Sequence, residues 1–171
     1  MRSEFRRLLP PGAYREIVSF RSNPPNRIGV LANRLGVRVT QEAMSYGHRG
    51  YLDYRSTEKG YVPTVVVGRH LSEAWKRWVV GHELGHHFLE GVDADFILMG
   101  DAHDAEQAAF LYLESDDSNE QRAENFAEDL FFGDGALKAA VSLHGRDVGR
   151  LANVFKVPSA KIRNRMRFER L

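Results

Sequence analysis

The most informative part of the chain is Trp75–Glu90, WKRWVVGHELGHHFLE, which carries the letters HELGH at positions 82–86. Residues four apart lie one turn apart on the same face of a helix, so His82 and His86 can offer two imidazoles to one metal ion. Apolar side chains recur at three- and four-residue steps through this stretch, which turns both histidines toward the core. Glu83 follows the first histidine and is placed to take a proton from a water at that ion. The stretch therefore predicts a zinc-binding helix; two hydrogen-bonded core histidines beside a surface glutamate are the weaker alternative.

The composition is that of one globular domain, and it excludes several kinds of site. The chain has 171 residues, 43% of them hydrophobic, which is enough to build a substantial core. It has no cysteine, so neither a disulfide nor a thiolate metal site can form. The first residues hold no apolar run long enough for a signal peptide or a membrane span. We therefore expect a cytoplasmic protein without a membrane partner.

Charge is unevenly distributed along the chain, although the net charge is only +1. Residues 1–50 hold nine arginines against three glutamates, residues 90–129 hold thirteen acidic residues, and the tail from Lys156 is basic again. Such segregation can mark a nucleic-acid surface. Because no aromatic residues are interleaved with the basic ones, nucleic acid is not the favoured partner.

Chain breakers and helical spacing divide the sequence into three predicted segments. Residues 1–25 form a loosely attached N-terminal arm, residues 26–135 form the core around the predicted zinc-binding helix, and residues 136–171 form a C-terminal helical segment. In the core, a helix over 27–35 that ends at Gly36 precedes a short strand at 37–39. Residues 44–69 alternate as two or three antiparallel strands, and helices are expected at 104–113 and 120–132. The predicted fold is α+β, mostly helical, with a small antiparallel sheet beside the HELGH helix.

The C-terminal segment reads as three short helices, at 136–144, 147–155 and 159–168, with Asp147 as an N-cap. The last two, joined by a short turn, have the spacing of a helix-turn-helix motif. A helical pair that only closes the core is the favoured interpretation.

A catalytic zinc needs a third protein ligand besides the two histidines. His87 points about 100° away from His86 on a helix and cannot share the ion. The HExxHxxGxxH arrangement would require a histidine at position 92, which is Val92. A carboxylate from the later helix is the remaining option, and Glu120 and Glu124 lie one turn apart there. Alanines at 123 and 127 leave room for that helix to pack closely.

The two motifs together, HELGHHFL at 82–89 and E-x-x-A-x-x-F-A at 120–127, resemble the ImmA/IrrE-type zinc metallopeptidases. The resemblance extends from about Ile28 to Phe168 and implies a zincin-like fold in which Glu120 is the third ligand and Glu124 lies outside the ligand set. The sequence departs from the family's pattern in its long acidic stretch between the two motifs. It departs again at 130–133, where LFFG stands in place of a Leu-Leu-Met-Pro-like end.

The resemblance also implies a function. Zinc held by His82, His86 and Glu120 would activate water, with Glu83 as the general base. The substrate would be a helix-turn-helix, Xre-like transcriptional repressor, and its cleavage would derepress stress, phage or mobile-element genes. An oxyanion donor is also needed, and the sequence does not choose among its candidates, which are Tyr51, Tyr54, His103 and Arg122.

Two other functions stay open at this point. The chain could be a DNA- or repressor-binding regulator whose zinc is structural, or a toxin–antitoxin component whose cleft is masked by an Xre-like partner. The glutamate at position 83 favours the peptidase, because a structural zinc site needs no base there.

Overall fold

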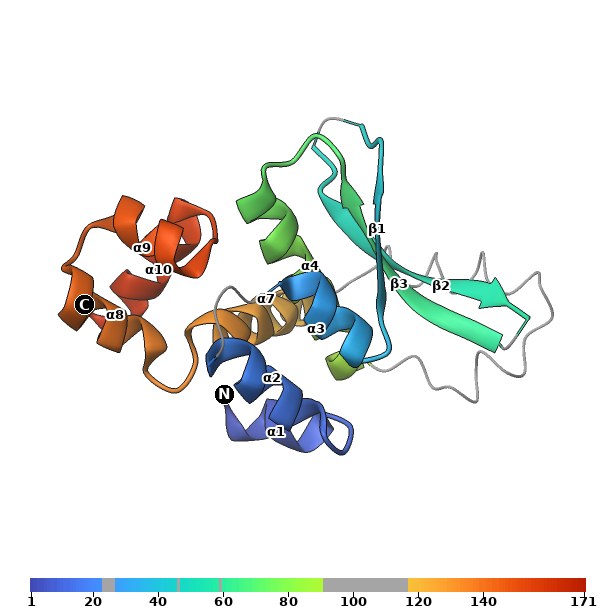
Figure 1. The fold of residues 1–171 in the computed structure, drawn as a ribbon, viewed down its shortest axis with the longest axis horizontal. Helices are drawn as coiled ribbons and strands as arrows, with labels where there is room; N and C mark the ends of the chain where they lie inside the picture. The colour runs from blue at the N-terminus through green and yellow to red at the C-terminus, as the bar shows by residue number, and fades with distance from the viewer. Residues whose placement is uncertain (23–26, 46, 59, 91–116) are drawn as a thin grey trace.

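The computed structural model describes residues 1–22, 27–45, 47–58, 60–90 and 117–171, which form eight helices and one three-stranded sheet (Figure 1). Helix α4, Glu73–Glu90, and helix α7, Asp117–Phe132, pack against each other in the middle of the molecule. The sheet lies on one side of this pair, and the three C-terminal helices lie on the other. The predicted α+β class is confirmed.

The sheet has the order β1-β3-β2, with strands β1 at Arg38–Glu42, β2 at Gly50–Thr57 and β3 at Gly60–Gly68. Strands β2 and β3 form the predicted antiparallel hairpin, and β3 buries residues 64–68 against α4. Strand β1 pairs with β3 in parallel, so the sheet is mixed and the expectation of a wholly antiparallel sheet was wrong. Alternation at 37–39 indicates a strand but does not identify its neighbour. The chain passes from β1 to β2 at the far edge of the sheet, and β3 then returns between them, parallel to β1.

The described part of the predicted N-terminal arm is packed on the core rather than loosely attached. It forms α1, Ser3–Leu8, and α2, Ala13–Ser22, and Phe5 and Ile17 are fully buried. The Phe5 ring lies edge-on to Phe126 of α7 at 5.8 Å, and Arg21 Nε donates to the Leu130 carbonyl at 3.1 Å. The prolines at 10 and 11 suggested a loose segment, but they lie between two short helices whose apolar faces pack on the core.

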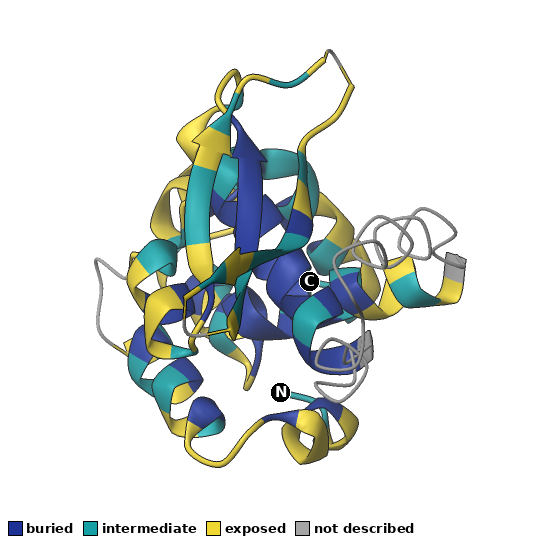
Figure 2. Ribbon diagram, turned by 90° about the vertical axis from the view of Figure 1, so that its right-hand side faces the viewer, coloured by how far each residue is buried: buried dark blue, intermediate teal, exposed yellow. Residues whose placement is uncertain are grey.

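The remaining helices agree with the sequence pattern. Helix α3, Ile28–Arg34, is followed by Gly36 at φ +81°, the left-handed conformation expected after a helix end. The last three residues of α7, at 130–132, are buried as predicted. Figure 2 shows the buried residues gathered along β3 and on the inward sides of the helices. The helix expected at 104–113 lies outside the described residues.

Three C-terminal helices complete the fold: α8 at Ala136–His144, α9 at Val148–Phe155 and α10 at Ser159–Glu169. Asp147 caps α9 as predicted, because its side chain accepts a hydrogen bond from the Arg150 amide at 2.9 Å. Phe155 of α9 packs edge-on against Phe132 of α7, with ring centroids 5.2 Å apart. Among the described helices, none is both long and apolar enough to cross a membrane.

Candidate metal centre

Helix α4 brings the two histidines of the HELGH motif together on its inward face. His82 Nε2 and His86 Nε2 lie 3.0 Å apart, and the His86 side chain is almost fully buried. The preceding turns of the same face bury Trp78 and Val79, so the apolar stripe predicted from the sequence does orient the pair.

Helix α7 supplies the carboxylate that faces them. Glu120 Oε2 lies 3.1 Å from His82 Nε2, and Glu120 Oε1 lies 3.3 Å from His86 Nε2. The two helices approach closely at this level, since Gly85 faces the backbone of Ala123 directly. The structure thus joins the three residues that the sequence and its resemblance proposed as ligands.

The separations of these atoms fit a small tetrahedral metal ion. With metal–ligand bonds of about 2.0–2.1 Å, the edges of a tetrahedron are about 3.3 Å long. The two nitrogens lie 3.0 Å apart and Glu120 Oε2 lies 3.1 Å from the first of them, both close to that edge, while the 3.3 Å contact with His86 is made by the other oxygen of the same carboxylate. Two imidazole nitrogens and one carboxylate oxygen are also a donor set that zinc accepts, with the fourth position left to water. Within the described residues, these three form the one group suited to holding a metal.

Glu124, the alternative ligand one turn further along α7, contacts the far side of the His82 ring. Its Oε2 lies 3.4 Å from His82 Nδ1 and accepts a hydrogen bond from Trp78 Nε1 at 3.1 Å, and its Oε1 accepts one from Lys161. Burial would raise the pKa of this carboxyl, but the hydrogen bonds from His82, Lys161 and Trp78 outweigh it and lower the pKa to about 2. Glu124 is therefore an ionised neighbour of the ligand set.

Lys161 is the residue at this site that sequence reasoning missed. It lies on α10, in the C-terminal helical segment, and 37 positions separate it from Glu124 in the sequence. Its ammonium also lies 4.9 Å from the Trp78 ring centroid. No local spacing in the sequence signals a contact of this range.

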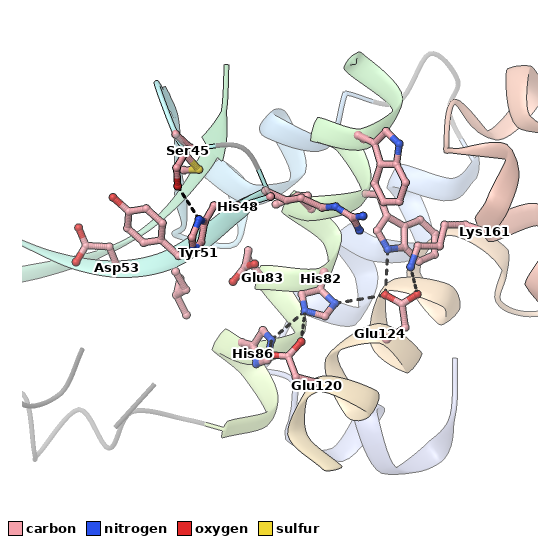
Figure 3. Close-up of a pocket in the computed structure, with 18 of the residues that line it drawn as sticks. Ser45, His48, Tyr51, Asp53, His82, Glu83, His86, Glu120, Glu124 and Lys161 are labelled. Atoms are coloured by element: carbon pink, nitrogen blue, oxygen red, sulfur yellow. Dashed lines mark hydrogen bonds and ion pairs between the residues drawn. The ribbon is translucent and has the colours of Figure 1, made fainter. Parts of the chain in front are cut away.

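A cleft of about 1190 Å³ opens in front of His82, His86 and Glu120, between α4, α7, strand β2 and residues 44, 45 and 47–49. Glu83 lines it and is 8% exposed. Figure 3 shows Glu83 beside His82 on the cleft side of α4, with Tyr51 and His48 across the opening. A carboxylate in this position can exchange a proton with a molecule bound at the histidines.

Of the four candidate oxyanion donors, Tyr51 lines the cleft. Burial, followed by the nearby carboxylates Glu42 and Asp53, raises the pKa of Tyr51, so its hydroxyl stays protonated, and it donates to Glu42 Oε2 at 3.5 Å. Tyr54 instead contacts His87 Nδ1 through its hydroxyl at 3.0 Å. Neither Tyr54 nor Arg122 is among the described residues that line the cleft, and His103 lies outside the described residues.

A mostly helical α+β fold, in which two histidines of one helix face a glutamate of a helix packed against it, is compatible with a metallopeptidase. Residues 32–167 match the sequence model of the IrrE N-terminal-like domain, peptidase family M78. The match covers most of the chain, which belongs to this family, and the resemblance drawn from the two motifs is confirmed. No curated protein matches the chain.

Proposed function

We propose that the chain is a zinc-dependent endopeptidase, with His82, His86 and Glu120 as metal ligands and Glu83 as general base. The observation that carries the proposal is the set of contacts of 3.0–3.3 Å that join two imidazole nitrogens of α4 to each other and to the two oxygens of one carboxylate of α7. Membership of a metallopeptidase family supports the same conclusion.

Zinc in this position would supply Lewis acidity, which polarises a peptide carbonyl and lowers the pKa of water toward neutrality. Glu83 would take the proton from the attacking water and deliver it to the leaving amide nitrogen. Tyr51, across the cleft, is the candidate oxyanion donor; its hydroxyl donates to Glu42 Oε2 at 3.5 Å and would have to turn toward the carbonyl oxygen on which negative charge develops.

The cleft suits an extended polypeptide. Strand β2 lines it through residues 50–53, and no other described strand pairs with the outer edge of β2. A free sheet edge offers backbone N–H and C=O groups to a substrate strand. The family resemblance supports a helix-turn-helix repressor as that substrate, with cleavage derepressing stress, phage or mobile-element genes. A DNA-bound substrate would make the cytoplasm the site of action.

The test is co-expression with the repressor encoded beside this gene, comparing wild type, Glu83→Gln and Glu73→Gln. The first substitution removes the base while keeping the shape of the side chain, and the second makes the same change at the exposed start of α4. We expect one cut in the repressor with wild type and with Glu73→Gln, and none with Glu83→Gln. Equal cleavage by all three variants would exclude Glu83 as the base.

A second candidate function, DNA binding, rests on the C-terminal segment. Residues 136–171 hold nine lysines and arginines and two carboxylates. Helix α9, a three-residue turn and helix α10 have helix-turn-helix spacing, and α10 exposes Arg163, Asn164 and Arg167 on one side. Arginine and asparagine are the side chains that pair with guanine and adenine edges in the major groove.

Anisotropy of a labelled DNA duplex tests this candidate at two salt concentrations. If α10 contacts DNA, changing Arg163 and Arg167 to alanine lowers affinity and reduces its salt dependence. Changing Arg7 and Arg15 to alanine removes the same charge from exposed positions on the two N-terminal helices and serves as the matched control. Equal loss in both double variants would indicate a general charge effect and remove the support for a recognition helix.

A further inference from the structure

We propose that Glu124 is a positioning residue for His82, and that Trp78 and Lys161 hold its carboxylate in place, so that α10 is part of the metal site. The inference rests on the proposed metal centre, because it concerns the orientation of one of its ligands. It assigns a task to a carboxylate that spacing alone could not separate from Glu120.

The number of donors explains why a carboxylate is required at position 124. Three N–H groups converge on it, from His82 Nδ1, Trp78 Nε1 and Lys161 Nζ. An ionised carboxylate has two oxygens and no hydrogen, so it can accept from all three. A glutamine has one oxygen and one NH2 group, which would face at least one of these donors.

The contact with Glu124 determines which nitrogen of His82 carries the proton. When Nδ1–H donates to Oε2 of Glu124 at 3.4 Å, Nε2 keeps its lone pair and points at His86 and Glu120. A metal ion needs that lone pair, and a carboxylate behind a histidine fixes its ring and increases its basicity. The carboxylate therefore prepares His82 as a ligand without touching the ion.

Lys161 restricts the carboxylate itself. The Lys161 side chain is 16% exposed, and its ammonium lies 4.9 Å and 5.8 Å from the ring centroids of Trp78 and Trp75. With Oε1 bound to this fixed cation, Oε2 is left facing Trp78 and His82 (Figure 3). The C-terminal segment thus reaches the metal site through one side chain.

The same two helices provide a matched control one turn away. Glu128 of α7 pairs with Arg165 of α10 at 2.8 Å, and its side chain is 16% exposed, close to the 24% of Glu124. Both bridges join α7 to α10, but the contacts of Glu124 continue to a proposed metal ligand. A purely structural role would make the two glutamates equivalent.

The experiment measures Zn2+ affinity of the purified full chain by competition with a chromophoric chelator, together with the visible absorption of bound Co2+. We expect Glu124→Gln to bind Zn2+ about 10- to 100-fold more weakly, as is typical when the partner of a histidine ligand is lost, and to change the Co2+ absorption. Glu128→Gln should bind Zn2+ as wild type does, because the pair of Glu128 with Arg165 contacts none of the three proposed ligands.

Glu124→Asp is the second variant, and it keeps the experiment informative should Glu124→Gln fail to fold. It keeps the charge but withdraws the carboxylate by one methylene, so it too should weaken Zn2+ binding. Wild-type affinity in Glu124→Asp, or equal behaviour of the Gln variants at 124 and 128, would overturn the inference while leaving the metal centre intact. If changing His82 and His86 to alanine leaves wild-type Zn2+ affinity unchanged, the metal centre itself is wrong, and the inference with it.

Discussion

Replacing Gly85 by alanine tests how closely the two ligand-bearing helices must approach. A Cβ atom at Gly85 would lie 2.8 Å from Ala123 Cα, 2.9 Å from its carbonyl oxygen and 3.2 Å from its Cβ. Carbon atoms in contact normally lie about 3.5–4.0 Å apart. These neighbours are mostly backbone, which cannot rotate away as the end of a side chain can. The helices must therefore separate by about 0.7 Å at this level.

Two opposing terms decide the effect of Gly85→Ala on stability. Alanine favours a helix over glycine by about 1 kcal/mol. Overpacking of a core contact costs about 1–3 kcal/mol, and a clash with backbone belongs at the upper end of that range. We therefore expect a net loss of about 2 kcal/mol, which lowers the urea midpoint by about 1 M.

The same displacement would affect the proposed metal site, because His82, His86 and Glu120 all lie within one turn of the contact. Metal–ligand distances tolerate changes of about 0.2 Å, which is less than the expected separation of the helices. Zn2+ affinity should therefore fall together with stability.

Gly29→Ala is the matched control, because a Cβ there meets nothing within 4 Å in helix α3. It should leave Zn2+ affinity unchanged and raise stability by up to about 1 kcal/mol. Urea unfolding followed by circular dichroism, with Zn2+ titration, measures both effects. A Gly85→Ala variant with wild-type stability and wild-type Zn2+ affinity would refute the argument from close approach.

Three further predictions concern stability. Phe132→Ala should cost about 3–5 kcal/mol in urea unfolding, because this ring is fully buried where α7 meets the C-terminal helices; a loss below 1 kcal/mol would contradict that packing. Asp147→Ala should cost about 1 kcal/mol through the lost cap of α9, and Asp147→Ser should recover most of it. Hydrogen bonds from the amino terminus and then from Arg21 lower the pKa of Asp134. Its contribution to stability is therefore complete above about pH 4 and is lost as the pH falls through the lowered pKa. Asp134→Asn should remove this part of the acid dependence of unfolding, and an unchanged acid profile would contradict the prediction.

The sequence predicted those features whose physical cause is local. The spacing of His82 and His86 determines their common helix face, and Asp147 identifies a helix start that the structure contains. The attachment of residues 1–22 was predicted wrongly, because the prolines in that region are obvious while the burial of Phe5 depends on Phe126, far along the chain. The parallel pairing of β1 was missed for a similar reason, since alternation identifies a strand but not its neighbour.

At the proposed metal centre, α4, α7 and α10 are joined by close helix packing and by an ion pair, and these two kinds of contact differ in how well a sequence predicts them. Close approach of two helices requires small residues on both, and the sequence shows such residues at the contact itself, Gly85 on α4 and Ala123 on α7. An ion pair between distant elements requires only opposite charges, and charged residues are frequent on the surface of any helix. The contact of Lys161 with Glu124 therefore cannot be predicted from the sequence around either residue. For this reason the spacing of the two motifs predicts the proposed ligands, whereas the proposed role of Glu124 in orienting His82 can be inferred only from the packing of the three helices.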